Sequence, residues 1–297
     1  MPGFDPESGE TIVLADAPGA GHWAGAPSLV VDENGRALLS YRRRAPRDGS
    51  ENQRGYLGAI AESTDGGRSF RDIWRVTKHE VGTSSLERFC LRRAPEGDWL
   101  LYTSWEGPPS SGRWRIDLMR APAPESFSPP SAVSVLLPDD LGVDAVKDPY
   151  VLTHEGEVLM YVSTFLTPRG PAPTWLATSR DGVSFSWQGE ALGVGVGWDA
   201  YQARLSSVAR FGAGFVGYYD GAGSVADDTE EHCGLAVSLD LHRWQRVTPD
   251  RPALVSPHAS GSLRYVEAVN IQGSSWAYYE YARPDGSHEL RRNQLAT

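Results

Sequence analysis

The sequence is poor in cysteine and lysine, and it contains no long hydrophobic run. Its 297 residues include only two cysteines, Cys90 and Cys233, which are too few for a disulfide-stapled scaffold. No apolar stretch approaches the ~20 residues that a membrane-spanning helix needs, and the first residues lack the apolar segment of a secretory signal peptide. We therefore expect a cytoplasmic protein with reduced thiols and no membrane partner.

Positive charge is also scarce, and nearly all of it is arginine. The 28 basic residues are outnumbered by 38 acidic ones, giving a formal net charge of −10, which argues against a nucleic-acid partner. Only Lys78 and Lys147 are lysines. Arginine binds anions in a fixed fork geometry and stacks on aromatic rings, so the positions of the arginines matter for function. No spacing of cysteine and histidine indicates zinc, and we expect neither a metal nor a cofactor.

What the sequence does contain is abundant glycine, proline and aromatic residues in a repeating order. Its 32 glycines and 21 prolines favour many turns, and its 10 tryptophans, 12 tyrosines and 8 phenylalanines favour short strands. Five segments share an apolar strand, a tight turn and a second strand that ends in tyrosine. These tyrosines recur about every 60 residues, at Tyr41, Tyr102, Tyr161, Tyr218 and Tyr278.

Two further strands follow each hairpin, except in the fifth repeat, which lacks a fourth strand. Four antiparallel strands repeated five times are typical of a five-bladed β-propeller, an all-β fold. We expect one domain, with blades at approximately 22–77, 83–137, 144–193, 200–248 and 260–297. A strand at residues 10–15 would complete the last blade and close the ring. Two β-sandwich domains are the alternative, but no linker divides the chain near its middle.

Charged and aromatic residues gather at the starts of the first strands and at the ends of the second strands. These positions share one face of a propeller, because the two strands form a hairpin. Substrate-binding candidates there are His22, Trp23, Arg42, Arg44, Arg88, Trp105, Lys147, Tyr201, Arg204, Tyr265 and Glu280. Catalytic candidates are Asp148, Glu87, Asp220 and Glu267. Carboxylates and arginines that converge from several blades predict a site for a small ligand that carries hydroxyls or an anion.

Short motifs add a family resemblance. The repeat length, the turns at 63–70 and 179–185, and the segment Val-Lys-Asp-Pro-Tyr-Val at 146–151 resemble the family 43 glycoside hydrolases. These are arabinanases, arabinofuranosidases and xylosidases with five-bladed propellers. The resemblance implies three carboxylates in the funnel, namely an Asp base, an Asp that tunes the pKa, and a Glu general acid. Inverting hydrolysis needs one carboxyl group to protonate the leaving oxygen and another to activate water.

Taken residue by residue, this resemblance is incomplete. Asp148 matches the internal Asp-Pro motif of the family, but the place of the first-blade base reads Gly-Ala-Pro, with Ala26 where the carboxylate is expected. Glu87 holds the equivalent position in the second blade. Glu267 and Asp220 are later candidates for the acid. The resemblance therefore leaves the base without a residue and the acid with several.

These observations predict a glycosidase-like enzyme that acts on a small carbohydrate or an anionic glycoside. A glycoside phosphorylase is an alternative, because phosphate is itself a nucleophile and needs no protein base. A non-catalytic propeller that binds a sugar or a protein is another, because loss of a catalytic carboxylate would produce one. Clustering of Glu87, Asp148 and a third carboxylate within ~10 Å around one pocket would favour catalysis, whereas pairing of these groups with arginines would favour binding.

Overall fold

The protein is built almost entirely from β-strands. The computed structural model describes residues 3–48, 51–107 and 113–296, so the expected blades 22–77, 83–137 and 260–297 each include positions outside the described residues. The helices are short: α1 (Lys78–Val81) and the 3-10 turns η1 (Pro6–Ser8), η2 (Pro124–Ser126), η3 (Pro129–Ser131) and η4 (Pro138–Asp140). In this described part of the chain, no helix is long and apolar enough to cross a membrane.

Most strands pair in antiparallel groups of four that follow the order of the chain. The first group contains β2 (Trp23–Val31), β3 (Ala37–Arg44), β6 (Leu57–Ser63) and β7 (Arg71–Thr77). The second group contains β8 (Leu86–Arg93), β9 (Trp99–Glu106), β10 (Trp114–Ala121) and β11 (Val133–Leu136). The third group contains β12 (Ala145–His154), β13 (Glu157–Phe165), β14 (Thr174–Ser179) and β15 (Ser186–Leu192).

The remaining strands come from the last part of the chain and from its start. The fourth group contains β16 (Gln202–Phe211), β17 (Gly214–Ala222), β18 (His232–Ser238) and β19 (Gln245–Arg246). The fifth contains β20 (Leu263–Ile271), β21 (Ser274–Ala282), β22 (His288–Gln294) and the early strand β1 (Glu10–Val13). A separate hairpin consists of β4 (Arg47–Asp48) and β5 (Glu51–Asn52).

The early strand β1 is held against β22 by both backbone and side chains. The two strands run antiparallel, and Glu10 faces Arg292 in the register. The Arg292 guanidinium donates to the Glu10 carboxylate at 2.8 Å. On the other side of β22, a single parallel pair, Trp23 with His288, links the fifth group to β2 of the first. The two ends of the chain therefore meet in one eight-stranded sheet.

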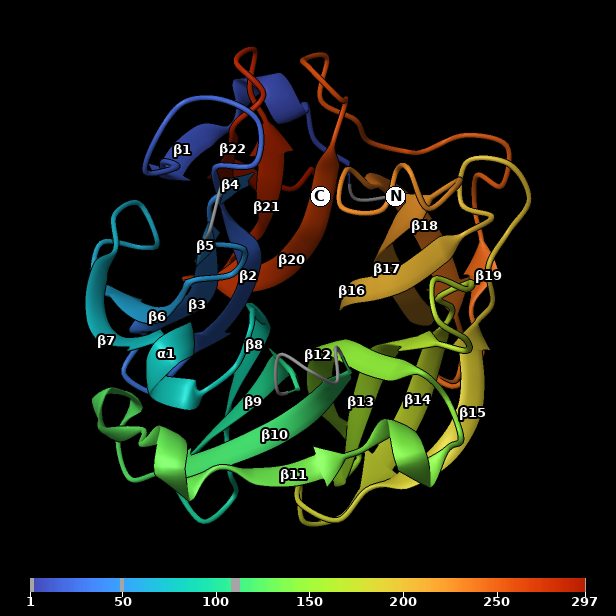
Figure 1. Cartoon of the computed structure of the whole chain (residues 1–297). Coiled ribbons are helices and arrows are strands. Elements are labelled where there is room, and N and C mark those ends of the chain that lie inside the picture. The colour runs from blue at the N-terminus through green and yellow to red at the C-terminus, as the bar shows by residue number, and fades with distance from the viewer. Residues whose placement is uncertain (1–2, 49–50, 108–112, 297) are drawn as a thin grey trace.

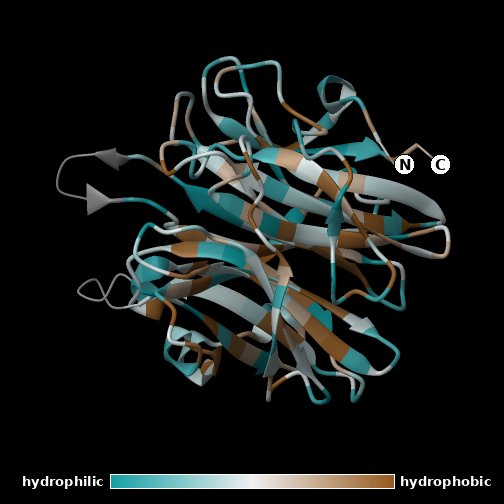
Figure 2. Cartoon of the chain, turned by 90° about the vertical axis from the view of Figure 1, so that its right-hand side faces the viewer, coloured by the Kyte–Doolittle hydropathy of each residue, from teal (hydrophilic) through white to brown (hydrophobic). Residues whose placement is uncertain are grey.

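Figure 1 shows the groups arranged around a common centre in the order of the chain, with β2, β8, β12, β16 and β20 nearest that centre. These inner strands contact one another, since β8 packs against β2 and β12, and β20 packs against β2 and β16. They are buried along much of their length, which explains their apolar composition. Hydrophobic residues lie mainly within the strands, and the loops are largely hydrophilic (Figure 2).

The hydrophobic core lies between neighbouring groups. Trp74 of the first group packs against Phe89 of the second, with their ring centroids 6.4 Å apart. The Trp74 indole N–H donates to the backbone oxygen of Phe127 at 2.9 Å, so its one polar atom is satisfied. Trp99 and Leu101 complete the same apolar cluster. Because each group shares its apolar faces with two neighbours, the groups stabilise one another in sequence around the centre.

Three of the five repeated tyrosines tie one group to the next, whereas Tyr41 donates to Asp72 of its own group at 3.0 Å. In these three, the phenol donates to a backbone oxygen in the serine–aspartate turn of the following group. The pairs are Tyr102 with Gly182 at 2.8 Å, Tyr161 with Leu241 at 2.6 Å, and Tyr278 with Gly67 at 2.9 Å. The third pair joins the fifth group to the first. The constant spacing of the tyrosines thus reflects a constant spacing between interlocked groups.

The turn that receives Tyr278 is fixed by its own side chains. The Asp65 carboxylate accepts hydrogen bonds from the backbone N–H and the hydroxyl of Ser69 at 3.0 and 2.6 Å, and the Ser63 hydroxyl accepts one from Gly67 at 3.0 Å. Hydrogen bonds from Ser69 and Ser63 hold the pKa of Asp65 well below its ordinary value. Asp65 is therefore a structural carboxylate that shapes a turn.

Candidate functional site

The inner strands of four groups bulge at the same point, β8 between Leu86 and Phe89, and three of the four have a left-handed residue there. The register of β2, β12 and β20 shifts around Ala26, Asp148 and Tyr265, where φ is 52°, 58° and 51°. A left-handed backbone at a residue other than glycine costs roughly 1–2 kcal/mol, and bulges of this kind re-aim side chains. Ala26 thus occupies in β2 the place that Asp148 holds in β12 and Tyr265 holds in β20.

Tyr265 is the hub of the buried centre. Its ring is 1% exposed, and four guanidinium groups surround it. The distances from guanidinium carbon to ring centroid are 4.0 Å for Arg204, 5.3 Å for Arg264, 5.9 Å for Arg88 and 6.0 Å for Arg42. The Tyr265 backbone N–H donates to the Asp220 carboxylate at 2.8 Å. Stacking of guanidinium groups on one ring accounts for part of the arginine excess in the sequence.

Carboxylates around Tyr265 are paired with these arginines. Arg204 contacts Asp148 at 2.9 Å and both Asp220 and Glu231 at 3.0 Å. Arg264 contacts Glu280 at 2.7 Å and also Glu231. All six side chains are at most 2% exposed. We call these six residues, with Tyr265 and Arg42, the central ion network. Glu231, which joins two of its arginines, was missed in the sequence because it lies in the loop before β18 rather than on a strand.

The arginines set the protonation of most of these carboxylates. Burial would raise the pKa of Glu280, but the charges of Arg264 and Arg42 outweigh it and lower that pKa well below its usual value. Glu231 behaves in the same way, with Arg264 as the main opposing charge. Asp220 differs, because burial dominates there and raises its pKa to about 6 although Arg204 opposes the change. Most of the network is therefore a compensated set of ions held out of water.

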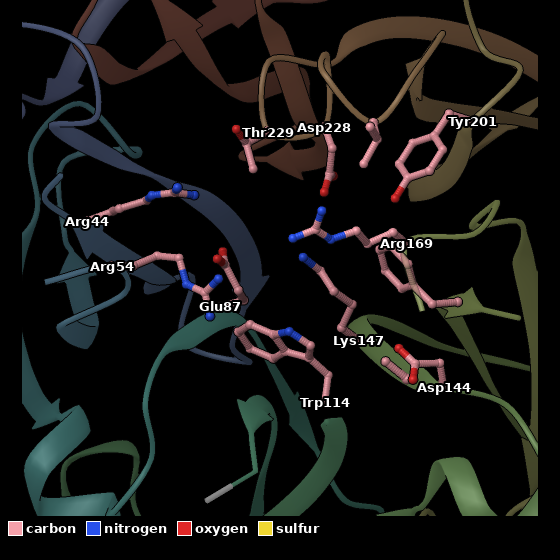
Figure 3. Close-up of a pocket in the computed structure, with 13 residues that line it drawn as sticks. Arg44, Arg54, Glu87, Trp114, Asp144, Lys147, Arg169, Tyr201, Asp228 and Thr229 are labelled. Atoms are coloured by element: carbon pink, nitrogen blue, oxygen red, sulfur yellow. The ribbon is translucent and has the colours of Figure 1, made fainter. Parts of the chain in front are cut away.

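A pocket of about 420 Å³ opens beside this network (Figure 3). Its charged lining comprises Arg44, Arg54, Glu87, Asp144, Lys147, Arg169 and Asp228, and its aromatic lining comprises Trp114, Phe165 and Tyr201. Four sequence-predicted site residues line it: Glu87, Arg44, Lys147 and Tyr201. The size suits one or two sugar rings, and the mixture of charge and aromatic surface suits a polar ring-shaped ligand.

The other sequence-predicted site residues lie outside the pocket lining. Those that are buried are Arg42, Arg88, Asp148, Arg204, Asp220, Tyr265, Glu267, Glu280, Trp23 and Trp105, whereas His22 is half-buried. Glu267 pairs with Arg88 at 2.6 Å. Trp105 packs in the core between the first and second groups. Trp23 stacks on His288 with centroids 4.5 Å apart. Their positions indicate that packing or ion pairing occupies these side chains.

Two of the pocket cations, Arg44 and Lys147, are less fully compensated than the arginines of the network, whereas Arg54 is paired with Glu106. Arg44 stacks on Trp23, 4.1 Å from the ring centroid, and its Nε has no hydrogen-bond partner among the described residues. Burial lowers the pKa of Arg44 to about 10, so the group is still charged at neutral pH. The Lys147 ammonium lies 3.5 Å from Asp148 and 5.1 Å from the centroid of the Trp114 ring.

Two pocket carboxylates differ in protonation. Burial would raise the pKa of Glu87, but Arg42, which donates to it at 2.8 Å, and Lys147 lower that pKa to about 2. Burial raises the pKa of Asp228, and the opposing charge of Lys147 does not cancel the effect. Glu87 is thus ionised across the physiological range, whereas Asp228 retains its proton to a higher pH than an ordinary aspartate.

Several pocket residues lie outside the strand starts and ends at which the sequence predicts the site. Asp228 and Arg169 come from the loops that follow β17 and β13, and Trp114 begins β10. Trp114 could have been predicted as a site residue, because it faces Glu106 across β9 and β10. The start of a third strand therefore lies beside the end of a second. The acidic run from Asp227 to Glu231 was a second signal. In the part of the chain that the structure describes, no His, Cys, Asp and Glu cluster could hold a metal ion.

Comparison of the sequence finds no match, but comparison of the structure finds proteins with the same fold. No family model matches the sequence, and no curated protein matches it. A thermostable family-43 glycoside hydrolase superposes with a TM-score of 0.70 at 12% identity, over 97% of this chain and 93% of that one. The RS223 β-xylosidase gives 0.68 at 12% identity, over 98% and 95% of the chains. The GH43_1 enzyme from Xanthomonas citri complexed with xylose gives 0.64 at 14% identity, over 95% and 90%.

These similarities define the class of fold. The chain has the all-β fold of the family 43 glycoside hydrolases, as the sequence repeat and motifs predict. Identities of 12–14% show the fold alone, so the chemistry has to be argued from the side chains of this pocket.

Proposed function

We propose that this protein is a glycosidase-like enzyme that binds a small carbohydrate in the pocket and cleaves it by acid–base catalysis. One observation carries the proposal: Glu87 and Asp228 come from different groups, line the same pocket, and have pKa values shifted in opposite directions. Hydrolysis requires such a division, because one carboxyl group must accept a proton while another gives one.

In this proposal Glu87 is the base and Asp228 is the acid. Arg42 fixes the orientation of the ionised Glu87 carboxylate at 2.8 Å. Glu87 takes a proton from water as the water oxygen bonds to the anomeric carbon, and Asp228 gives its proton to the glycosidic oxygen as the old C–O bond breaks. Exchange of one proton from Glu87 to solvent and one from solvent to Asp228 restores the starting state.

The aromatic lining supports a sugar as the ligand. Trp114, Phe165 and Tyr201 offer flat apolar surface beside charged groups, which matches the C–H faces and hydroxyl edges of a sugar ring. Structures with the same fold are described as complexes with xylose and with xylotriose. They support a ligand of this size in the present pocket.

The test is a comparison of the wild type with Glu87→Gln and Asp228→Asn on a panel of aryl glycosides, including uronides. Each change should lower kcat/KM about 100-fold or more. Asp228→Asn should also lose the alkaline limb of the pH profile and recover activity on substrates with strongly acidic leaving groups. Asp227→Asn is the matched control, because this exposed neighbour makes the same chemical change in the same loop. Undiminished turnover in both pocket variants would overturn the proposal.

A second candidate is a non-catalytic carbohydrate-binding protein. The specific observation in its favour is that Asp148, Asp220 and Glu267 are paired with arginines and that Ala26 stands where a base is expected. Sugar binding without turnover on any glycoside of the panel would assign this function.

Phosphorolysis is a third candidate, carried by the incompletely compensated cations of the pocket and by Ala26. Phosphate would attack the anomeric carbon itself, so only the acid, Asp228, would be needed from the protein. Phosphate-dependent release of a sugar 1-phosphate in the same assays would assign this reaction, and turnover that does not change with phosphate would exclude it.

For the architecture behind this site we propose a single five-bladed propeller over residues 1–297, in which β1 completes the last blade. The antiparallel pairing of β1 with β22 and the hydrogen bond from Tyr278 to Gly67 support ring closure. Deleting residues 1–15 would test it, because an open fifth blade should lower the unfolding midpoint and promote association through the exposed edge of β22.

A further inference from the structure

We propose that Arg44, Lys147 and Arg169 form an anion subsite in the pocket, and that it recognises an oxyanion carried by the sugar, of which the carboxylate of a uronic acid is the type. This inference rests on the proposed carbohydrate function and names its substrate class. The three cations come from separate elements, namely the end of β3, the strand β12 and the loop after β13. Figure 3 shows all three side chains at the pocket.

Two of the three pocket arginines, Arg44 and Arg169, differ from Arg54, which is paired with Glu106. Among the described residues, no carboxylate lies within ion-pairing distance of Arg44, and none lies within that distance of Arg169. Elsewhere in the chain, half-buried arginines are paired: Arg246 contacts Asp199 at 2.5 Å, and Arg291 contacts Glu289 at 2.6 Å. Pairing is thus common among half-buried arginines, and Arg44, which is itself half-buried, departs from it. Arg169 is exposed, and it joins the subsite as a cation open to the pocket.

Arg44 has a buried donor that no acceptor satisfies among the described residues. Its Nε is buried and has no hydrogen-bond partner in the described structure, although the guanidinium is charged. A buried donor without an acceptor is unfavourable, whereas a bound oxyanion would supply one with charge assistance. Stacking on Trp23 at 4.1 Å fixes the plane of the guanidinium in advance, so little freedom is lost on binding.

Lys147 is only partly compensated by carboxylates. Its only ion-pair contact in the described chain is Asp148 Oδ2 at 3.5 Å, and Arg204 already holds that same oxygen at 2.9 Å. Two other carboxylates are near enough to feel its charge. Glu87 is engaged by Arg42 at 2.8 Å, and Asp228 keeps a raised pKa although Lys147 opposes the change. Lys147 is therefore available to a second anion from the pocket side.

Aromatic surface beside the cations favours an anionic sugar over free phosphate as the ligand. The Lys147 ammonium sits 5.1 Å from the ring centroid of Trp114 and 5.9 Å from that of Phe165, so the cations adjoin an aromatic wall. Free phosphate has no apolar face to place on that wall, whereas a uronic acid joins a sugar ring to a carboxylate. The arrangement favours a ligand that carries both.

The test is calorimetric titration of the wild type, Arg44→Gln and Arg169→Gln with glucuronate and galacturonate, with the matching neutral sugars, and with inorganic phosphate, all at constant ionic strength. The uronates should bind at least about 10-fold more tightly than the neutral sugars. Each substitution should weaken uronate binding about 10-fold or more while changing the affinity for a neutral sugar less than about 2-fold. Arg210→Gln, an exposed arginine on β16, is the control that should change neither.

The outcomes separate this inference from the proposed function. Equal affinity for uronates and neutral sugars, or uronate binding that survives both substitutions, overturns the subsite. Phosphate that binds through the same arginines when uronates do not overturns the sugar-borne anion and assigns the cations to phosphate. Arginine-dependent uronate binding without turnover would keep the subsite and dismiss the hydrolase. Because Arg169 is exposed, Arg169→Gln tests the idea even where Arg44→Gln folds poorly.

Discussion

Two adjoining regions of the molecule use the same residue types in opposite ways. In the central ion network, Arg204 and Arg264 are buried and each contacts at least two carboxylates. In the pocket, Arg44 and Arg169 have no carboxylate partner among the described residues. Both regions place positive charge beside aromatic rings. What separates them is charge compensation, because Arg204 contacts three carboxylates and Arg44 contacts none among the described residues.

This difference indicates what each region is for. A compensated buried ion is part of the architecture, since removing its partner would leave a charge out of water. In our proposal, an uncompensated cation at the pocket opening is a position for a ligand. Glu87 belongs to both regions, because Arg42 binds its carboxylate from the network while its side chain lines the pocket. Through Arg42, the network therefore fixes the orientation of the Glu87 carboxylate in the pocket.

Replacing Arg204 is the strongest test of the difference between the two regions. Replacement by methionine would leave Asp148, Asp220 and Glu231 without their shared cation, at 0–1% exposure. We expect Arg204→Met to lower the free energy of unfolding by about 3–5 kcal/mol, measured by urea denaturation. A loss below about 1 kcal/mol would contradict the view that this network is a compensated structural unit.

The next largest expected effect is a change in how the free energy of unfolding depends on pH. The pKa of Glu87 is lowered in the folded state from 4.5 to about 2, because nearby cations outweigh its burial. Between pH 2 and 4.5 the unfolded chain therefore binds more protons, and stability falls as pH falls through that range. We expect about 2–3 kcal/mol of this loss to disappear in Glu87→Gln, measured by denaturation at pH 3 and pH 6.

Asp220 tests the direction of this pH dependence, because its pKa is shifted the opposite way to that of Glu87. Its pKa is raised to about 6, so its contribution runs the other way and stability is lost as pH rises between about 4 and 6. Asp220→Asn should therefore gain stability relative to the wild type as pH rises through that window. A Glu87→Gln variant that loses as much stability on acidification as the wild type would show that Glu87 is not held ionised by its neighbours.

Much of the fold could be predicted from the sequence, and the reason is visible in the tyrosines. Tyr102, Tyr161 and Tyr278 recur at one spacing because each donates to the turn of the following group. A contact that repeats around the structure leaves a repeat in the sequence. The serine–aspartate turns are recognisable for a related reason, since Asp65 binds backbone groups only a few residues away.

The candidate site was predictable only in part, because its defining property is not local. Arg44 and Arg204 both occupy strand positions at the expected rim, and nothing in the neighbouring residues tells the unpaired arginine from the paired one. The distinction depends on carboxylates from other groups, such as Asp148 against Arg204, 56 positions away. Asp228 and Arg169 lie in loops of irregular length, where a repeat cannot assign equivalent positions.

A smaller effect concerns Ala26, which marks the missing carboxylate. Ala26 is fully buried, and its backbone N–H donates to the Glu280 carboxylate at 3.0 Å. A new carboxylate there would face an existing anion, so we expect Ala26→Asp to be about 1–2 kcal/mol less stable than Ala26→Asn. Asparagine is the matched control because it has the same shape and also tolerates a left-handed backbone. Equal stability of the two variants would mean that this position accommodates a charge.

The smallest expected effect is the most informative about the pocket. Arg169 is exposed and has no carboxylate partner among the described residues, so Arg169→Gln should change the unfolding free energy by less than about 0.5 kcal/mol without ligand. With a saturating uronate, the wild type should gain stability in proportion to the logarithm of ligand concentration, and the variant should gain less. A large loss without ligand would place Arg169 with the compensated arginines of the network. A small loss that becomes large only with ligand would assign Arg169 to the recognition surface. This is the division predicted by the carboxylate partners of Arg204 and by their absence at Arg44 among the described residues.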